Sequence, residues 1–199
     1  MARARWLRTD EYEEAVRSLE WAETQALSLE ADPYAWKWVL IAMHNVAQGF
    51  MVLALWNGNG LLALRDKIAA KWLEAYRNDG QFPVEKLDEF LNLYKKVKDA
   101  NNFHTVGAGP FSPGPTHDQT FKRLNSFRNE FIHFTPKGWS LELAGLPRLC
   151  LDTLDLVEFF GWNSTAILWH KRVQLVRTKR ALKRLRRTMR DLDDKYASG

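Results

Sequence analysis

Arg128, Asn129 and His133 are the residues of this chain whose types and spacing are best suited to chemistry. Histidine exchanges protons near neutral pH, so it can serve as an acid or as a base. Arginine stays charged and can hold a phosphate through two parallel hydrogen bonds. Together with a polar residue directly after the arginine, they form a set that could cut RNA or could merely decorate a helix surface. The surrounding sequence has to decide between these interpretations.

The three residues lie in a helix predicted from Thr116 to about Phe134, which Thr135-Pro136-Lys137-Gly138 ends. Asn129 and His133 are four positions apart and share a helix face. On an ideal helix, however, Arg128 points about 140° away from His133. The long arginine side chain can span part of that angle, and distortion of the helix before Pro136 could help, but one chain supports a tight pair poorly. Two copies meeting along this helix would supply the missing group, which predicts a dimeric site.

Composition indicates a folded chain without disulfides. Of its 199 residues, 46% are hydrophobic and nine are tryptophan, which excludes a disordered protein. The length suits one well-packed domain with some excess, or two small ones. A single cysteine, Cys150, excludes a disulfide framework and a cysteine-rich metal site. The basic first residues are not followed by a long apolar core, so we expect no secretory signal and a cytoplasmic location.

Nearly every segment has the apolar periodicity of a helix, and no alternating pattern is long enough for a sheet. Asn101 to about Pro115 is rich in glycine and proline and is predicted to be a loop, and 139–143 is short and predicted to be extended. The fold class expected is therefore all-α, an up-and-down helical bundle with a long basic C-terminal helix. The helices are predicted at about 10–31, 34–56, 61–77, 83–100, 116–134, 147–160 and 164–195.

The second predicted helix contains an apolar stretch, Trp38 to Trp56, that is nearly long enough to cross a bilayer. His44, Asn45 and Gln48 lie near its middle, where unpaired polar groups are costly in lipid, so we expect a buried bundle helix and no membrane association. Together with Lys37, these residues form one narrow polar stripe on the helical wheel. The stripe could be an internal hydrogen-bond network or could line a catalytic or dimer groove, and both can hold at once.

The positive charge of the chain is concentrated at its C-terminal end. Residues 163–199 contain eleven Lys or Arg and three Asp, a net charge of +8. Residues 1–162 contain eighteen Lys or Arg and 21 Asp or Glu, a net charge of −3. We therefore divide the chain into a bundle, 10–162, and a basic amphipathic helix, 163–199. The basic residues that could bind RNA are Lys171, Arg172, Arg177, Lys179, Arg180, Lys183, Arg184, Arg186, Arg187 and Arg190.

Apolar residues recur along the same helix every seven positions, at Leu168, Leu175, Leu182 and Met189, with Leu185 and Leu192 as a second line. The first explanation is that this apolar stripe packs on the bundle or on a second copy, with the charges solvated. Contact with RNA phosphates is the second, because clusters of Lys and Arg drive such binding. Membrane-surface binding is the third, since the apolar face lacks deep aromatic anchors.

The histidines do not predict a metal site. His44, His104, His117, His133 and His170 show no paired spacing of the kind that metal ligands need. His104 and His117 flank the loop rich in glycine and proline and are expected to be exposed. No sequence feature indicates a cofactor.

The Arg-Asn-x3-His pattern in an all-α chain of this size resembles the HEPN superfamily (higher eukaryote and prokaryote nucleotide-binding domains). Its members are helical bundles marked by an arginine, an adjacent polar residue and a histidine near a helix end, which Arg128, Asn129 and His133 match. The segments AWKWVLIAMHNVAQGFMVLAL and HFTPKGWSLELAGLPRLCLD are similar to a group of bacterial HEPN-like proteins. The resemblance covers about residues 10–162.

The resemblance implies a homodimer in which two motifs face each other, often with metal-independent endoribonuclease activity that leaves 2′,3′-cyclic phosphate ends. It implies that His133 is the general acid or base, that Arg128 stabilises charge on the phosphate oxygens, and that Asn129 positions one or the other. Many members are toxins paired with a nucleotidyltransferase-like antitoxin. Others have lost catalysis and serve as modules that bind nucleic acid or protein, so this alternative stays open.

Overall fold

The computed structural model describes residues 5–56, 58–133 and 136–198. In these ranges the chain is all-helical, as predicted, and has no β-strand. A π-helical turn, Phe159–Asn163, and two short 3-10 turns, Leu61–Ala63 and Ala100–Asn102, accompany the α-helices. The seven α-helices of the described residues are α1 (Glu11–Ala26), α2 (Ala35–Ala54), α3 (Asp66–Arg77), α4 (Phe90–Lys96), α5 (His117–Ile132), α6 (Leu146–Glu158) and α7 (Arg172–Ala197).

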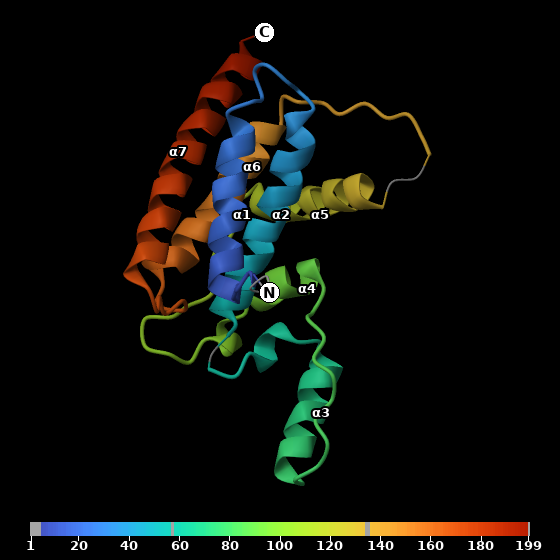
Figure 1. The fold of residues 1–199 in the computed structure, drawn as a ribbon, viewed down its shortest axis with the longest axis vertical. Helices are drawn as coiled ribbons and strands as arrows, with labels where there is room; N and C mark the ends of the chain where they lie inside the picture. The colour runs from blue at the N-terminus through green and yellow to red at the C-terminus, as the bar shows by residue number, and fades with distance from the viewer. Residues whose placement is uncertain (1–4, 57, 134–135, 199) are drawn as a thin grey trace.

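Helices α1, α2, α6 and α7 run along the long axis of the molecule as two hairpins, α1 with α2 and α6 with α7 (Figure 1). α5 lies across them and packs on α2 and α6, and its C-terminal end extends beyond the bundle on the side opposite α7. α3 projects from the lower end, away from the other helices. The all-α bundle expected from the periodicity is confirmed.

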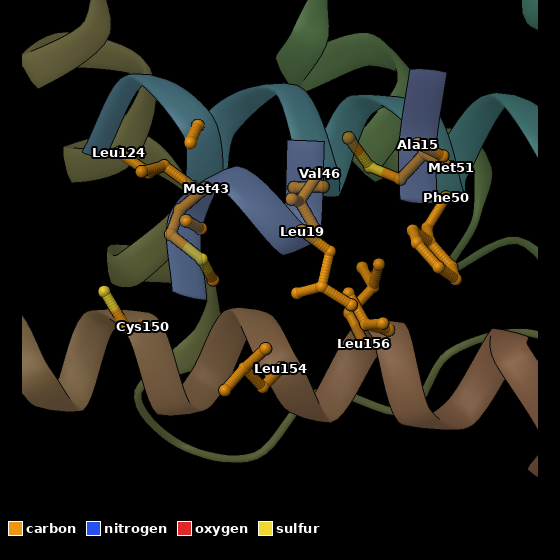
Figure 2. Close-up of a cluster of buried hydrophobic side chains, with 14 of the residues drawn as sticks. Ala15, Leu19, Met43, Val46, Phe50, Met51, Leu124, Cys150, Leu154 and Leu156 are labelled. Carbon is orange, nitrogen blue, oxygen red and sulfur yellow. The ribbon is translucent and has the colours of Figure 1, made fainter. Parts of the chain in front are cut away.

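α2 is the central helix because its surface is apolar almost all round. Val39, Leu40, Met43, Val46 and Phe50 are completely buried in the core. Figure 2 shows Met43, Val46 and Phe50 among side chains of α1, α5 and α6. α1 and α2 approach so closely that a Cβ added to Gly49 would lie 2.9 Å from that of Ala15, which explains a glycine at this point of a helix. Within the described residues, no helix is both long and apolar enough to span a membrane.

α7 shares the core of the bundle and does not form a separate unit. Ala181, Leu182, Leu185, Met189 and Leu192 are buried and belong to the same hydrophobic cluster as α1, α2 and α6. The stripe expected from the heptad spacing is therefore packed on its own chain at four of its six positions. Leu175 is only half-buried, and Leu168 lies before the helix and is 64% exposed. The boundary at 163 consequently separates two parts of one core.

The third and fourth predicted helices differ most from the structure. The segment 61–77 contains a 3-10 turn and then α3, and only Phe90–Lys96 of the predicted 83–100 is α-helical. In these segments, hydrogen bonds between distant residues replace those of a helix. Arg65 N–H donates to Lys86 O at 3.1 Å, and Asp88 N–H donates to Ala63 O at 2.9 Å. These bonds hold the chain extended where the side-chain pattern alone favours a helix.

The remaining helices begin and end close to their predicted bounds, with three differences. α1 ends at Ala26 instead of about Ala31. α7 begins at Arg172 instead of Ser164, because Ser164 N–H closes the π turn on Phe159 O at 2.8 Å. α5 ends at Ile132, and the predicted end at Phe134 and Thr135 lies outside the described residues. Residues 139–143 are irregular, with no strand partner among the described residues.

Candidate functional site

The C-terminal end of α5 carries the Arg-Asn-x3-His motif. Phe121 and Leu124 anchor the helix in the core, and its last turn extends outward from there. His133 N–H still donates to Asn129 O at 2.8 Å, but the backbone of His133 has left the helical region, with φ −96° and ψ 57°. Pro136 follows three residues later and cannot continue a helix. The backbone of His133 is therefore still hydrogen-bonded to the last turn of α5, but its side chain points in a different direction from that of a helical residue at this position.

This local geometry brings the three motif residues together within one chain. Arg128 Nη1 lies 3.1 Å from Asn129 Oδ1, to which it donates, and 3.5 Å from His133 Nε2. The expectation that one chain supports the pair poorly is corrected, because the helix ends at Ile132 and the backbone of His133 departs from the ideal helix on which the angle was judged. A guanidinium can only donate, so this contact is a hydrogen bond in the tautomer whose Nε2 accepts.

The motif is open to solvent and positively charged. Asn129 and His133 are exposed, and Arg128 is half-buried. The neighbouring carboxylate of Glu130 is bound by Lys137 Nζ at 2.5 Å, so it does not oppose the charge of Arg128. A fixed guanidinium beside an accessible imidazole can hold a phosphate oxygen and exchange a proton with a nearby hydroxyl.

His44 of α2 lies behind the motif as a buried, neutral histidine. Its Nε2 is 3.3 Å from Asn125 Oδ1, and its ring stacks on Phe90 with centroids 4.0 Å apart. Burial lowers the pKa of His44 to about 4, and the nearby charge of Arg128 acts in the same direction. His44 therefore helps to hold α5 in place through Asn125, but it stays neutral and does not exchange protons at neutral pH.

Asn125 was not among the predicted site residues, although it carries the contact between α5 and His44. A signal was present in the sequence, because Asn125 is four positions before Asn129 and so lies on the same face of α5. A polar residue on that face could have been paired with the polar stripe of α2.

The four residues of the α2 stripe do not line one groove. His44 faces α5, and Lys37 lines a hollow of about 300 Å³ with Phe131 and Trp139, next to the last turn of α5. Asn45 is exposed and lines a different hollow beside Trp21 of α1. Gln48 is half-buried. Lys37 and His44 thus border α5, whereas Asn45 does not.

The ten cations predicted for RNA binding on α7 fall into two groups. Four form ion pairs with acids of the bundle. Arg177 is the most strongly held, with its Nη1 3.0 Å from Glu13 and its Nη2 2.6 Å from Glu20. Lys171, Arg184 and Arg186 pair with Asp10, Glu23, and Asp155 and Glu158 respectively. Among the described residues no ion pair forms at Arg172, Lys179, Arg180, Lys183, Arg187 or Arg190.

A cluster of possible metal ligands lies elsewhere, between α5 and α6, where His117, Asp152 and Asp155 offer atoms within 4.8 Å of one another. His104 is exposed as expected, but the expectation that His117 is exposed is wrong, because Phe111 and α6 cover it. His117 Nδ1 accepts a hydrogen bond from Gly114 N–H at 3.0 Å. The neutral ring therefore carries its proton on Nε2, the atom that points toward the carboxylates, and cannot donate a lone pair there.

Both carboxylates of this cluster are also compensated by arginines. Arg148 Nε lies 3.0 Å from Asp152 Oδ1, and Arg186 Nη2 lies 3.0 Å from Asp155 Oδ1. Thr120 Oγ1 donates to Asp152 Oδ2 at 2.7 Å. We interpret the cluster as a polar network that joins α5, α6 and α7, and assign no metal to it.

Comparison of the chain with protein-family models, with curated proteins and with solved structures finds no match in any of the three. What can be said of function therefore depends on the geometry of the motif and on the resemblance of its residues.

Proposed function

We propose that this chain is a HEPN-type endoribonuclease that acts as a homodimer and needs no metal ion. The observation that carries the proposal is the convergence of Arg128, Asn129 and His133 at the exposed end of α5. The residues that match the HEPN pattern are also the ones that lie together, accessible to a large substrate such as RNA.

The reaction expected is transfer within the RNA backbone. The ribose 2′-oxygen bonds to the adjacent phosphorus, the bond from phosphorus to the 5′-oxygen breaks, and a 2′,3′-cyclic phosphate remains. One proton leaves the 2′-hydroxyl and one is taken up by the departing 5′-oxygen. His133 would move a proton, and Arg128 would stabilise negative charge on the phosphate oxygens. Asn129, which accepts from Arg128, would fix the position of the guanidinium.

The number of groups that can move protons supports the proposed dimer. The reaction needs a base and an acid, whereas His44, the other histidine beside Arg128, is kept neutral by burial. Two copies of the motif facing one groove would provide two accessible imidazoles. The apolar hollow lined by Tyr34 and Trp139 beside the last turn of α5 offers a surface for such a contact.

A second candidate is a non-catalytic dimer that binds nucleic acid or protein. The number of imidazoles favours it, because one motif contains only one accessible imidazole. A dimer in which the two motifs do not face each other could hold a phosphate without cutting RNA. On the catalytic proposal the setting would be that of a bacterial toxin or defence effector in the cytoplasm, with a nucleotidyltransferase-like antitoxin as a partner.

The decisive experiment is incubation of the purified protein with RNA in EDTA. Wild type should cut and leave 2′,3′-cyclic ends, and His133→Ala should lose about 10²- to 10⁴-fold in rate. Arg128→Ala should lose about 10²- to 10³-fold. His104→Ala, which changes another exposed histidine, is the matched control and should cut normally. Equal cleavage by wild type and His133→Ala would overturn the proposal, and cleavage by neither would leave the binding module.

Mixing two inactive variants tests whether the pair works within one chain. Arg128→Ala and His133→Ala protomers are exchanged, and native mass spectrometry confirms the mixed dimer. Because Arg128 and His133 lie 3.5 Å apart in one chain, the mixed dimer contains no intact pair and should stay inactive. Recovered cleavage would mean that each pair is formed between chains. Light scattering should find a dimer at micromolar concentration, and a monomer would contradict the assembly.

A further inference from the structure

Four cations that form no ion pair within the described residues lie in one row on the outer face of α7. Their spacing of four, four and three residues places them on the same side of the helix, along about 16 Å of its axis. All four are exposed, and together they border a hollow of about 470 Å³ between α7 and the π turn. We call this hollow the α7 groove. Its cations are Lys179, Lys183, Arg187 and Arg190.

The other lining residues leave the α7 groove positive. Arg186 and Glu158 also border it, but they neutralise each other through a 2.8 Å ion pair. Asp191 is the one remaining acid among the lining residues. Trp162 forms an apolar wall, and Lys179 Nζ lies 5.0 Å from the centroid of its ring.

This arrangement is unfavourable for the isolated chain. Like charges four residues apart on a helix repel each other, and no acid of the described bundle relieves this row as Glu13 and Glu20 relieve Arg177. A polyanion lying along the row would remove the repulsion. The groove has no exposed aliphatic side chains to enter a bilayer, since its lining leucine, Leu182, is buried. A row of cations beside an indole is instead the combination found where proteins follow a single-stranded backbone.

We propose that the α7 groove binds the phosphates of single-stranded RNA. α7, which carries the groove cations, lies on the opposite side of the bundle from the end of α5 (Figure 1). The α7 groove is therefore a docking surface separate from the motif. Only the choice of RNA over other polyanions rests on the proposed function. Binding itself does not require His133.

The test is fluorescence anisotropy with a labelled 20-nucleotide oligo-uridine, with every protein also carrying His133→Ala so that nothing is cut. Four phosphate contacts should give a log–log salt slope of about −2.8, or about 50-fold weaker binding at 200 mM than at 50 mM salt. Replacing the four groove cations by glutamine should abolish most of this slope. Asp191→Asn should instead tighten binding about twofold at low salt.

The matched control removes the same charge from α3 and the segment after it, by glutamine at four exposed cations without ion pairs among the described residues. These are Lys67, Lys71, Arg77 and Lys86. The control should keep the slope, and circular dichroism should show both variants folded.

Equal loss of RNA binding in the two variants would mean that only net charge matters and would overturn the proposal. So would a groove variant that still binds RNA normally but no longer binds phosphatidylserine vesicles. Wild-type protein that binds RNA through the α7 groove but does not cut it would refute the catalytic function alone.

Discussion

His44 should make the folded protein less stable as the pH falls from 7 to 5. The ring is 4% exposed, stacks on Phe90 and has Arg128 nearby, so protonating it in the folded state is unfavourable. Burial lowers its pKa to about 4, whereas an unfolded histidine has a pKa of about 6.5. The folded state therefore binds fewer protons between these values, and stability that is complete above pH 6.5 is lost as the pH falls toward 4.

The magnitude follows from the size of the shift. A pKa difference of about 2.5 corresponds to about 3.4 kcal/mol in total, of which about 2 kcal/mol is lost between pH 7 and pH 5. Glu20 contributes little in this window, because an unfolded glutamate is already mostly ionised at pH 5 and the hydrogen bond from Arg177 keeps the pKa of the folded carboxyl lower still. Burial raises the pKa of Asp155, which acts with the opposite sign, so a comparison of two proteins is needed.

Urea denaturation at fixed protein concentration, followed by the fluorescence of the nine tryptophans, measures this loss at pH 7, 6 and 5. The comparison is with His44→Gln, which keeps a side chain able to donate to Asn125 but cannot be protonated. Whatever its stability at pH 7, the variant should lose about 2 kcal/mol less than wild type by pH 5. If both proteins lose the same amount, His44 is not held neutral by its surroundings and the reasoning fails.

Two further predictions concern how α7 is attached. Arg177→Met should lower the free energy of unfolding by about 1–3 kcal/mol, because it leaves the partly buried Glu13 and Glu20 with only the exposed Arg17 as a partner. Arg180→Met, at an exposed cation, should change it by less than about 0.5 kcal/mol. Leu185→Ala should cost about 2–5 kcal/mol because the side chain is fully buried, and Leu168→Ala should be nearly neutral because that leucine is 64% exposed. Urea denaturation measures both pairs, and a destabilising Arg180→Met or Leu168→Ala would show that the packing of α7 is misplaced.

The sequence predicted the parts of the fold in which apolar periodicity alone decides the structure. α2 was expected at 34–56 and spans Ala35–Ala54, because a helix that is apolar almost all round has to be central. The segments 83–89 and 164–171 were expected to be helical and are not. There, hydrogen bonds to distant residues, such as Asp88 N–H to Ala63 O, replace those of a helix. Such partners are not visible in a local pattern.

The motif shows the same limit at atomic scale. Its residue types pointed to Arg128, Asn129 and His133, but the ideal wheel placed the arginine and the histidine about 140° apart. The helix ends at Ile132, and a single non-helical residue brings the two side chains to 3.5 Å. Because helix ends are the least predictable part of a helix, a site placed there can be recognised by type but not by geometry.

The cations of α7 show the same limit along a whole helix. Heptad spacing predicted an amphipathic helix, yet it treated all ten cations as equivalent. The fold separates them, because it brings Glu13 and Glu20 beside Arg177 from more than 150 residues earlier in the chain. Within the part of the chain that the structure describes, Lys183 and Arg187 form no ion pair. One side of α7 therefore uses its charge to hold the bundle together. The other side keeps its charge uncompensated. A count of basic residues does not contain this difference, which identifies the face of α7 that is available for a polyanion.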